Sequence, residues 1–323
     1  MKKFFAAFFL LLAVGVSAQE KVSGLSKPVS LSIGFNQMKV ASGVSDPIAL
    51  AIGSTTPNVR ADLTSVTKEE AKEALAKTAP PAAAANRPNY YALLIGVEKY
   101  QYANANLGNL NQPVKDANAL MGVLAGDYSF KQENVLFLKN PTRDQIITAF
   151  EDLAKKVTPK DNLLIFYAGH GIWDERLKVG YWLPSDAKTD NKSAWIANST
   201  IRDYISGIQS KHTLLITDAC FSGSIFKTRE VISEVNEYAV AKIYQLPSRK
   251  AMTSGTLTTV PDTSKFMEYL LKRLRDNTNN FLTARQLFFS VETAVMNNTN
   301  TVPQFGVIQE TGDEGGDFIF MRK

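Results

Sequence analysis

Several residue types are scarce in this 323-residue sequence, which has one cysteine, two histidines and three tryptophans. One cysteine excludes an internal disulfide, and two histidines make a histidine-rich zinc site improbable. Neither sign of charge dominates, because 36 Lys and Arg oppose 31 Asp and Glu for a formal net charge of +5. There is also no dense basic cluster, so nucleic acid is not an expected partner.

Long apolar runs are lacking after the first residues. Two lysines precede an uncharged apolar run at 4–16, and small residues occupy positions 16–18. This pattern is typical of a secretory signal peptide, residues 1–18, cleaved after Ala18. The alternative is a transmembrane anchor, but the run is short for a span of roughly 20 residues. We therefore expect an exported protein, periplasmic or secreted, with no membrane attachment after signal removal.

Residues 19–88 differ in composition from the rest of the chain. They are rich in Ser, Ala, Thr, Val and Pro, and they close with an Ala-rich stretch at 80–85. We interpret this region as a low-complexity spacer or pro-segment. Alternatively, the part from Leu31 to Ile52 contributes a few strands. The remaining residues, 89–323, are enough for one sizeable core.

Apolar runs and helical patterns alternate through residues 89–323, which favours an α/β fold with a mainly parallel sheet between helices. A small hairpin is expected at Tyr181–Pro184. The predicted strands are Tyr91–Val97, Asn134–Leu138, Leu163–Tyr167, Leu214–Ile216, Lys250–Ser254, Gln304–Ile308 and Asp317–Met321. The predicted helices are Pro113–Ala125, Thr142–Val157, Thr200–Ile208, Ser264–Arg275 and Thr283–Met296.

The lone cysteine follows one of these strands almost at once. Leu214, Leu215 and Ile216 suit a strand buried on both faces, and the acidic and small residues 217–219 separate them from Cys220. A thiol just past the carboxyl end of a buried strand lies where open α/β sheets place their ligands. A lone free thiol in an exported protein indicates a reactive cysteine, the alternative being a buried, inert one.

A second apolar run has the same form. Residues 163–167 are followed by Ala168-Gly169-His170-Gly171, and the two glycines let backbone approach a ligand closely. His170 precedes Cys220 by 50 positions. If their strands are neighbours in a parallel sheet, the strands lie about 5 Å apart and both side chains can face one substrate. A thiol and an imidazole so placed suit nucleophilic catalysis with proton transfer.

The segments 169–171, Gly-His-Gly, and 218–223, Asp-Ala-Cys-Phe-Ser-Gly, resemble the caspase/metacaspase family of cysteine peptidases, in which the His also lies about 50 residues upstream of the Cys. The resemblance begins near Asn89 and is closer to bacterial metacaspase-like proteins, because Asp218 stands where caspases carry Gln. It implies a caspase-like three-layer sandwich with a mostly parallel six-stranded sheet and helices on both faces. The implied activity is that of a cysteine endopeptidase.

The resemblance also implies a role for each site residue. Cys220 would be the nucleophile and His170 the acid/base, without a third orienting residue. The backbone N–H groups of Gly171 and Cys220 would stabilise the oxyanion. The other histidine, His212, begins a strand, and we expect it to be structural or solvated.

Two carboxylates indicate which substrate residue the protein would prefer before the cleaved bond. Asp218 lies two residues before the nucleophile and would favour Lys or Arg before the cleaved bond through a charge-assisted hydrogen bond. The resemblance implies Asp116 as the second acid of this pocket. The alternatives are a strand-end cap for Asp218 and a solvated helix position for Asp116. Metacaspases often carry Ser where Ala168 stands, so this pocket loses one hydroxyl but no charge. The expected partner is thus a protein or peptide substrate with a basic residue before the cleaved bond.

Aromatic and acidic residues outside these motifs are candidates for lining a substrate cleft and for binding calcium. Trp173, Tyr181 and Trp182 could line a substrate cleft, although core packing is expected for at least one of them. No cofactor is expected, but the acidic turn 312–317 leaves calcium dependence open, even though it lacks the spacing of an EF-hand.

Basic residues suggest places for self-cleavage. Lys77 and Arg87 lie in the early linker. The segment Ile225–Arg249, whose length predicts an exposed loop, carries Lys227, Arg229, Lys242 and Arg249. The alternative for this later segment is a helix at Val231–Ala241.

Two other functions remain open from the sequence alone. One is a catalytically idle caspase-like module that binds or assembles with other proteins. The other is a transpeptidase, which would transfer the acyl group to an amine instead of water.

Overall fold

The computed structural model describes residues 88–219, 225–229, 237–255 and 263–323. The predicted signal peptide and nearly all of the predicted spacer lie outside this part of the chain, and so does Cys220. No helix within the described residues is long and apolar enough to cross a membrane.

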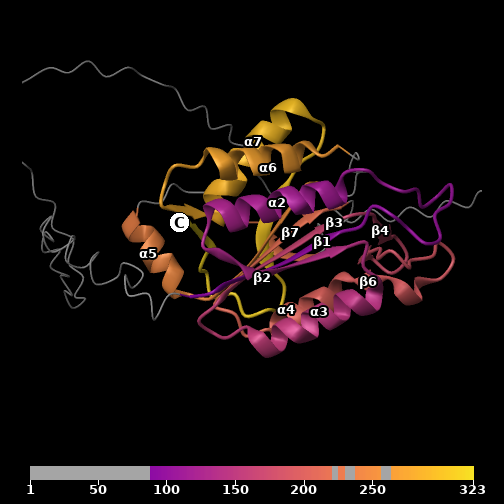
Figure 1. The fold of residues 1–323 in the computed structure, drawn as a ribbon, viewed down its shortest axis with the longest axis horizontal. Helices are drawn as coiled ribbons and strands as arrows, with labels where there is room; N and C mark the ends of the chain where they lie inside the picture. The colour runs from indigo at the N-terminus through magenta and orange to yellow at the C-terminus, as the bar shows by residue number, and fades with distance from the viewer. Residues whose placement is uncertain (1–87, 220–224, 230–236, 256–262) are drawn as a thin grey trace, which may run out of the picture. The chain divides into compact units, whose positions relative to one another are not determined.

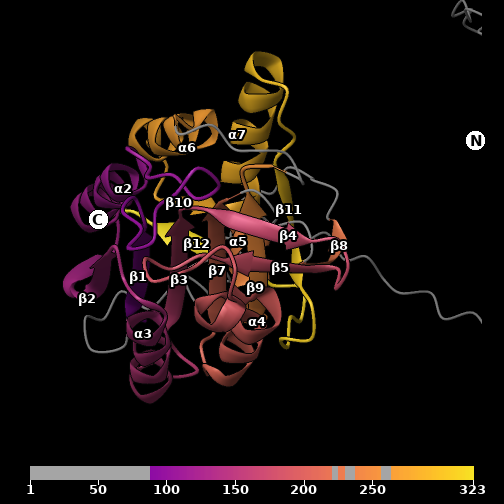
Figure 2. The same cartoon turned by 90° about the vertical axis from the view of Figure 1, so that its right-hand side faces the viewer.

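A seven-stranded sheet lies at the centre, in the order β2-β1-β3-β7-β9-β11-β8 (Figure 2). Strands β2 to β9 in this order are parallel, whereas β11 is antiparallel to both β9 and β8. The first six strands form the predicted mostly parallel sheet, and the short β8 extends its edge. Their bounds are β1 Tyr90–Gly96, β2 Phe130–Lys139, β3 Asn162–Ala168, β7 His212–Asp218, β8 Phe226–Arg229, β9 Ser248–Thr253 and β11 Gln304–Ile308.

Helices cover both faces of the sheet and complete three layers (Figure 1). On one face lie α2 (Pro113–Asp127), α6 (Lys265–Asp276) and α7 (Ala284–Asn298), and their apolar side chains pack on Leu94, Leu164 and Leu214. On the other face α3 (Arg143–Lys156) and α4 (Asn198–Gly207) pack on Leu93, Ile165 and Leu215. The predicted sandwich of helices around a mainly parallel sheet is therefore confirmed.

The sequence explains why the central strands are buried on both faces. All seven residues of β3 and all seven of β7 are buried, and successive side chains enter opposite layers.

The local sequence also explains where two of the helices start. Thr142 caps α3 by accepting from the N–H of Gln145, whose side chain accepts from the N–H of Thr142. Pro113 occupies the first turn of α2, where a missing N–H costs little.

Two small sheets depart from the predicted pattern. A hairpin forms, but it pairs β4 (Gly171–Asp174) with β5 (Val179–Trp182) instead of lying at the predicted Tyr181–Pro184, and β6 (Ile196–Ala197) extends it. The strand expected at Asp317–Met321 shortens to β12 (Ile319–Met321). It pairs with β10 (Phe281–Thr283) rather than closing the main sheet. Periodicity marks a strand but does not select its partner, and here β8 occupies the outer edge of β11.

Much of the segment predicted as an exposed loop is helix and strand. Helix α5 spans Glu237–Gln245, and Arg249 is buried within β9. Arg249 is therefore not an accessible cleavage site. Lys77 and Arg87 of the early linker lie outside the described residues.

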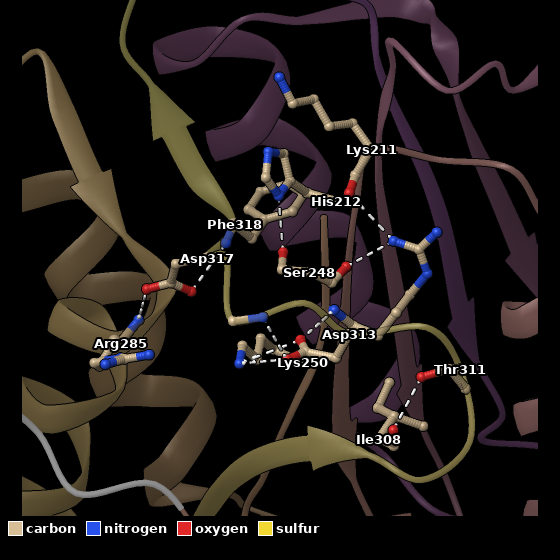
Figure 3. Close-up of polar contacts among 12 residues, drawn as sticks. Lys211, His212, Ser248, Lys250, Arg285, Ile308, Thr311, Asp313, Asp317 and Phe318 are labelled. Atoms are coloured by element: carbon tan, nitrogen blue, oxygen red, sulfur yellow. Dashed lines mark hydrogen bonds and ion pairs between the residues drawn. The ribbon is translucent and has the colours of Figure 1, made fainter. Parts of the chain in front are cut away.

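A buried polar cluster lies where β7 and β9 begin (Figure 3). The imidazole of His212 contacts the Ser248 hydroxyl at 2.8 Å and the carbonyl of Tyr244 at 3.1 Å. Burial lowers the pKa of His212 to about 3, so this side chain is neutral and structural, as predicted. Nearby, the fully buried Lys250 ammonium pairs with the Asp313 carboxylate at 3.2 Å.

We expect Asp313→Ala to lower the free energy of unfolding by about 3 kcal/mol, because it leaves the Lys250 ammonium buried without this counter-charge. Denaturant unfolding followed by circular dichroism measures the change. Asp276→Ala, which breaks the exposed pair with Lys272, is the matched control and should change stability little. Equal losses in the two variants would show that the buried pair contributes no more than a surface pair.

Candidate functional site

Three strand ends meet at the carboxyl edge of the sheet. Gly96 of β1 pairs with Ala168 of β3, which pairs with Asp218 of β7. Neighbouring parallel strands lie about 4.8 Å apart, so these residues form a short row across the sheet. Figure 2 views this edge, with the β4–β5 hairpin in front of the strands. The loop with His170 leaves β3 here, and the chain passes from Asp218 through Ala219 toward Cys220.

The backbone of His170 is held from both sides. Its N–H donates to the hydroxyl of Tyr100 at 2.8 Å. Its carbonyl accepts from the hydroxyl of Tyr167 at 2.7 Å and from the N–H of Leu183 at 3.1 Å. The ring of Tyr167 in turn stacks on buried Trp182, with centroids 4.2 Å apart. The position of His170 thus depends on aromatic residues of the core as well as on its own loop.

The imidazole of His170 has a defined orientation. Its Nε2 lies 2.8 Å from the carbonyl oxygen of Gly108, and its ring lies 5.1 Å from that of Tyr100. A carbonyl only accepts hydrogen bonds, so Nε2 carries a hydrogen in this contact, and a neutral His170 is the Nε2–H tautomer. Nδ1 is then the nitrogen that can take or give a proton. Sequence reasoning found no third group orienting this histidine, because the Gly108 carbonyl is backbone and carries no side-chain signal.

Gly169 is required where β3 ends. Its φ of +158° is one that other residues rarely adopt. A Cβ built there would lie 2.9 Å from the Tyr167 hydroxyl oxygen and 3.1 Å from Val97 Cβ. The glycine therefore lets the loop pack against the same tyrosine that holds His170.

Asp218 is buried, with 7% of its surface exposed. Burial raises the pKa of its carboxyl from 3.8 to about 6, whereas the hydroxyls of Ser254 and Ser264 oppose the increase. Ser264, the N-cap of α6, donates to Asp218 Oδ1 at 3.0 Å. Sequence reasoning missed both serines as neighbours of Asp218, because no local pattern links residues this far apart in the chain.

Asp116 lies in the first turn of α2, half-buried, on the same side of the sheet as Ala168. A Cβ built on Gly96 would lie 2.7 Å from the Pro113 carbonyl oxygen, so this helix start rests directly on the end of β1. Asp218 contacts the start of α6 on this side too. The structure thus brings both predicted acids to the same edge and the same face of the sheet.

The structure describes all the other predicted site residues except Cys220. Ala168 is buried beside Asp218, and Gly171 begins β4 opposite Trp182. Cys220, predicted as nucleophile and oxyanion donor, lies outside the described residues. Of the aromatic residues, Trp182 packs in the core, whereas Trp173 and Tyr181 are half-buried in the β4–β5 hairpin.

The acidic turn 312–317 is engaged within the protein. Asp313 accepts from the backbone N–H of Arg249 and pairs with Lys250, while Asp317 accepts from the N–H groups of Arg285 and Phe318 (Figure 3). Within the described residues, no group of three or more His, Cys, Asp or Glu side chains is arranged to hold a metal ion.

Together these observations define a class of protein. It is an α/β sandwich with a glycine-flanked histidine after one parallel strand and an aspartate at the end of the neighbouring strand in the sheet. Residues 89–311 match the caspase domain family, and the chain belongs to this family. The predicted relationship to caspases and metacaspases is thereby confirmed.

Individual relatives are distant. The chain is 28% identical over 171 residues to metacaspase-1 of Eremothecium gossypii, covering 46% of this chain and 36% of that protein. It is 30% identical over 168 residues to metacaspase-1A of Neurospora crassa, covering 45% and 36%. The match thus spans little more than a third of these relatives' length. Among solved structures, caspase-1 from Spodoptera frugiperda has a TM-score of 0.49 at 15% identity, covering 71% of this chain and 92% of that chain.

We expect Gly169→Ala to lower the free energy of unfolding by about 2 kcal/mol, because the Cβ meets the Tyr167 hydroxyl and the backbone angle disfavours alanine. Thermal and denaturant unfolding measure this change. Gly122→Ala is the control, since Gly122 lies in α2 with open space around it; alanine there should stabilise by about 1 kcal/mol. Stabilisation at both positions would contradict the role assigned to Gly169.

Proposed function

We propose that this protein is a cysteine endopeptidase that hydrolyses peptide bonds after Lys or Arg with a dyad of Cys220 and His170. The observation that carries the proposal is the β3–β7 register, which pairs Ala168 with Asp218. His170 follows Ala168 by two positions, and Cys220 follows Asp218 by two positions. Each candidate residue thus follows, by the same number of positions, one member of the last residue pair of two neighbouring parallel strands.

The chemistry proceeds by acyl transfer. The Cys220 thiolate attacks the carbonyl carbon of the peptide bond, and the negative charge on the carbonyl oxygen is stabilised by the N–H groups of Gly171 and Cys220. Nδ1 of His170, which has taken the proton of the Cys220 thiol, donates it to the departing amine, and the C–N bond breaks to leave a thioester. Nδ1 then accepts a proton from water, which attacks the thioester; the C–S bond breaks, and the acid and the Cys220 thiolate are released. The Gly108 carbonyl holds Nε2–H throughout and keeps Nδ1 available.

The substrate preference follows from the carboxylates at this edge. Asp218 is buried where a charge-assisted hydrogen bond to guanidinium or ammonium is little weakened by water. Asp116 adds a second carboxylate from the first turn of α2. Ala168, the neighbour of Asp218 in β3, contributes no polar group to the pocket. The cation of a Lys or Arg side chain is therefore the group that best fits the pocket.

The test of the reaction is hydrolysis of fluorogenic peptides that vary only in the residue before the cleaved bond. We expect wild type to release fluorophore after Arg and Lys, and we expect Cys220→Ala to lose activity while it keeps the thermal unfolding midpoint of wild type. A folded wild type that cleaves none of the peptides would support the idle-module alternative. Activity retained by Cys220→Ala would exclude the proposed nucleophile.

A second test concerns pH and Asp218. Arginine and citrulline have nearly the same shape but differ in charge, so the ratio of kcat/KM for a matched peptide pair isolates the pocket charge. Asp218 gains a proton as pH falls through about 6, so the preference for arginine should be present above this pH and decline below it. Asp218→Asn should lower kcat/KM for the arginine peptide at least tenfold at pH 7, about 1.4 kcal/mol.

The citrulline peptide should lose less activity in the Asp218→Asn variant. Equal losses for both peptides would mean that Asp218 supports the fold or the thiol rather than substrate charge.

A further inference from the structure

The Asp218 carboxylate lies where three elements meet. It ends β7, it lies near Ser254 just after β9, and it contacts Ser264 at the start of α6. Ser254 and Ser264 are 2% and 7% exposed, so the carboxylate and its Ser264 donor meet with little water present. The proposed substrate pocket therefore has polar residues beyond its two acids.

The Ser264 hydroxyl makes two different hydrogen bonds. It accepts from the N–H of Met267 at 3.3 Å as the N-cap of α6, and it donates to Asp218 Oδ1 at 3.0 Å. A hydroxyl has one donor and two acceptor positions, so both bonds can exist together. The second bond also places the carboxylate beside the N-terminus of a 12-residue helix, where negative charge is favoured.

We propose that Ser264 is a positioning residue of the substrate pocket: its hydroxyl fixes one Asp218 oxygen and keeps the carboxylate ionised and oriented for the cation of the substrate. The inference rests on the proposed function and deepens it. Ser264 does not touch the substrate in this account but acts through Asp218.

The physical reason is the cost of burying a charge. A carboxylate removed from water prefers to be protonated, and a protonated carboxyl attracts a guanidinium far less strongly. A hydrogen bond donated to the charged form opposes this effect and turns the carboxylate in a fixed direction. Without the Ser264 donor, Asp218 should gain its proton at a higher pH and hold arginine less well at neutral pH.

Other titratable groups lie at this edge, and the experiment must separate them from Asp218. They are Glu98 and Lys99 after β1, Asp116 on α2, His170 after β3 and the Lys265–Glu268 pair on α6. Cys220 follows Asp218 by two positions in the sequence and lies outside the described residues. His170 and Cys220 act on both members of the arginine and citrulline pair, so their titration cancels in the kcat/KM ratio. Asp116 is present unchanged in every variant compared.

The experiment measures this ratio from pH 5 to 8 in wild type, Ser264→Gly and Ser264→Thr. Glycine is tolerated at N-caps but offers no donor, whereas threonine keeps both the cap and the donor. We expect Ser264→Gly to raise the pH midpoint of the kcat/KM ratio by about half a pH unit and so to lower the ratio about twofold at pH 6 and about 1.2-fold at pH 7. Ser264→Thr should keep the wild-type midpoint.

Thr142→Gly is the matched control, because it removes the N-cap hydroxyl of α3, which bonds within its own helix start. Its midpoint should equal that of wild type whatever its stability. An unchanged midpoint in Ser264→Gly, or an equal shift in Thr142→Gly or Ser264→Thr, would overturn the proposal. A wild type that does not distinguish arginine from citrulline would instead refute the specificity part of the proposed function, and with it the premise of this inference.

Discussion

The pairing of β3 with β7 is the constraint on which the rest of the site depends. Seven consecutive residue pairs hold these strands in register, from Asn162 and His212 to Ala168 and Asp218. Because side chains alternate between faces, a slip by one residue would turn Asp218 away from α2 and α6. The full burial of both strands opposes such a slip, since it would exchange the side chains that fill the two core layers. The core and the site therefore specify the same register.

Much of this arrangement could be predicted from local sequence. The apolar runs of β1, β3 and β7 located the central strands, and the N-cap Thr142 and the first-turn Pro113 located two helix starts. Strand ends followed by glycine, histidine or acidic residues also located the candidate site, because parallel strands share a carboxyl edge. Here the physical signal lies within a few residues of the element that it predicts.

Contacts between distant segments could not be predicted in the same way. Nothing near Tyr100 indicates that its hydroxyl receives the N–H of His170, and the Ser264 hydroxyl reaches Asp218 only because α6 packs beside α2 on the same face. The apolar pattern at Asp317–Met321 predicts a strand that closes the main sheet, yet β12 pairs with β10. Each of these depends on tertiary packing, which hydrophobic periodicity does not encode.

The central claim is that this register lets His170 act on Cys220, and thiol alkylation tests it most directly. Cys220 is the only cysteine, so the incorporation of iodoacetamide, followed by mass spectrometry, reports this residue alone. A thiolate paired with an imidazolium forms below the ordinary cysteine pKa of about 8.5. The account predicts rapid alkylation of wild type at pH 6 to 7 and, in His170→Ala, alkylation that becomes rapid only near pH 8.5. The same pH profile in both proteins would contradict it.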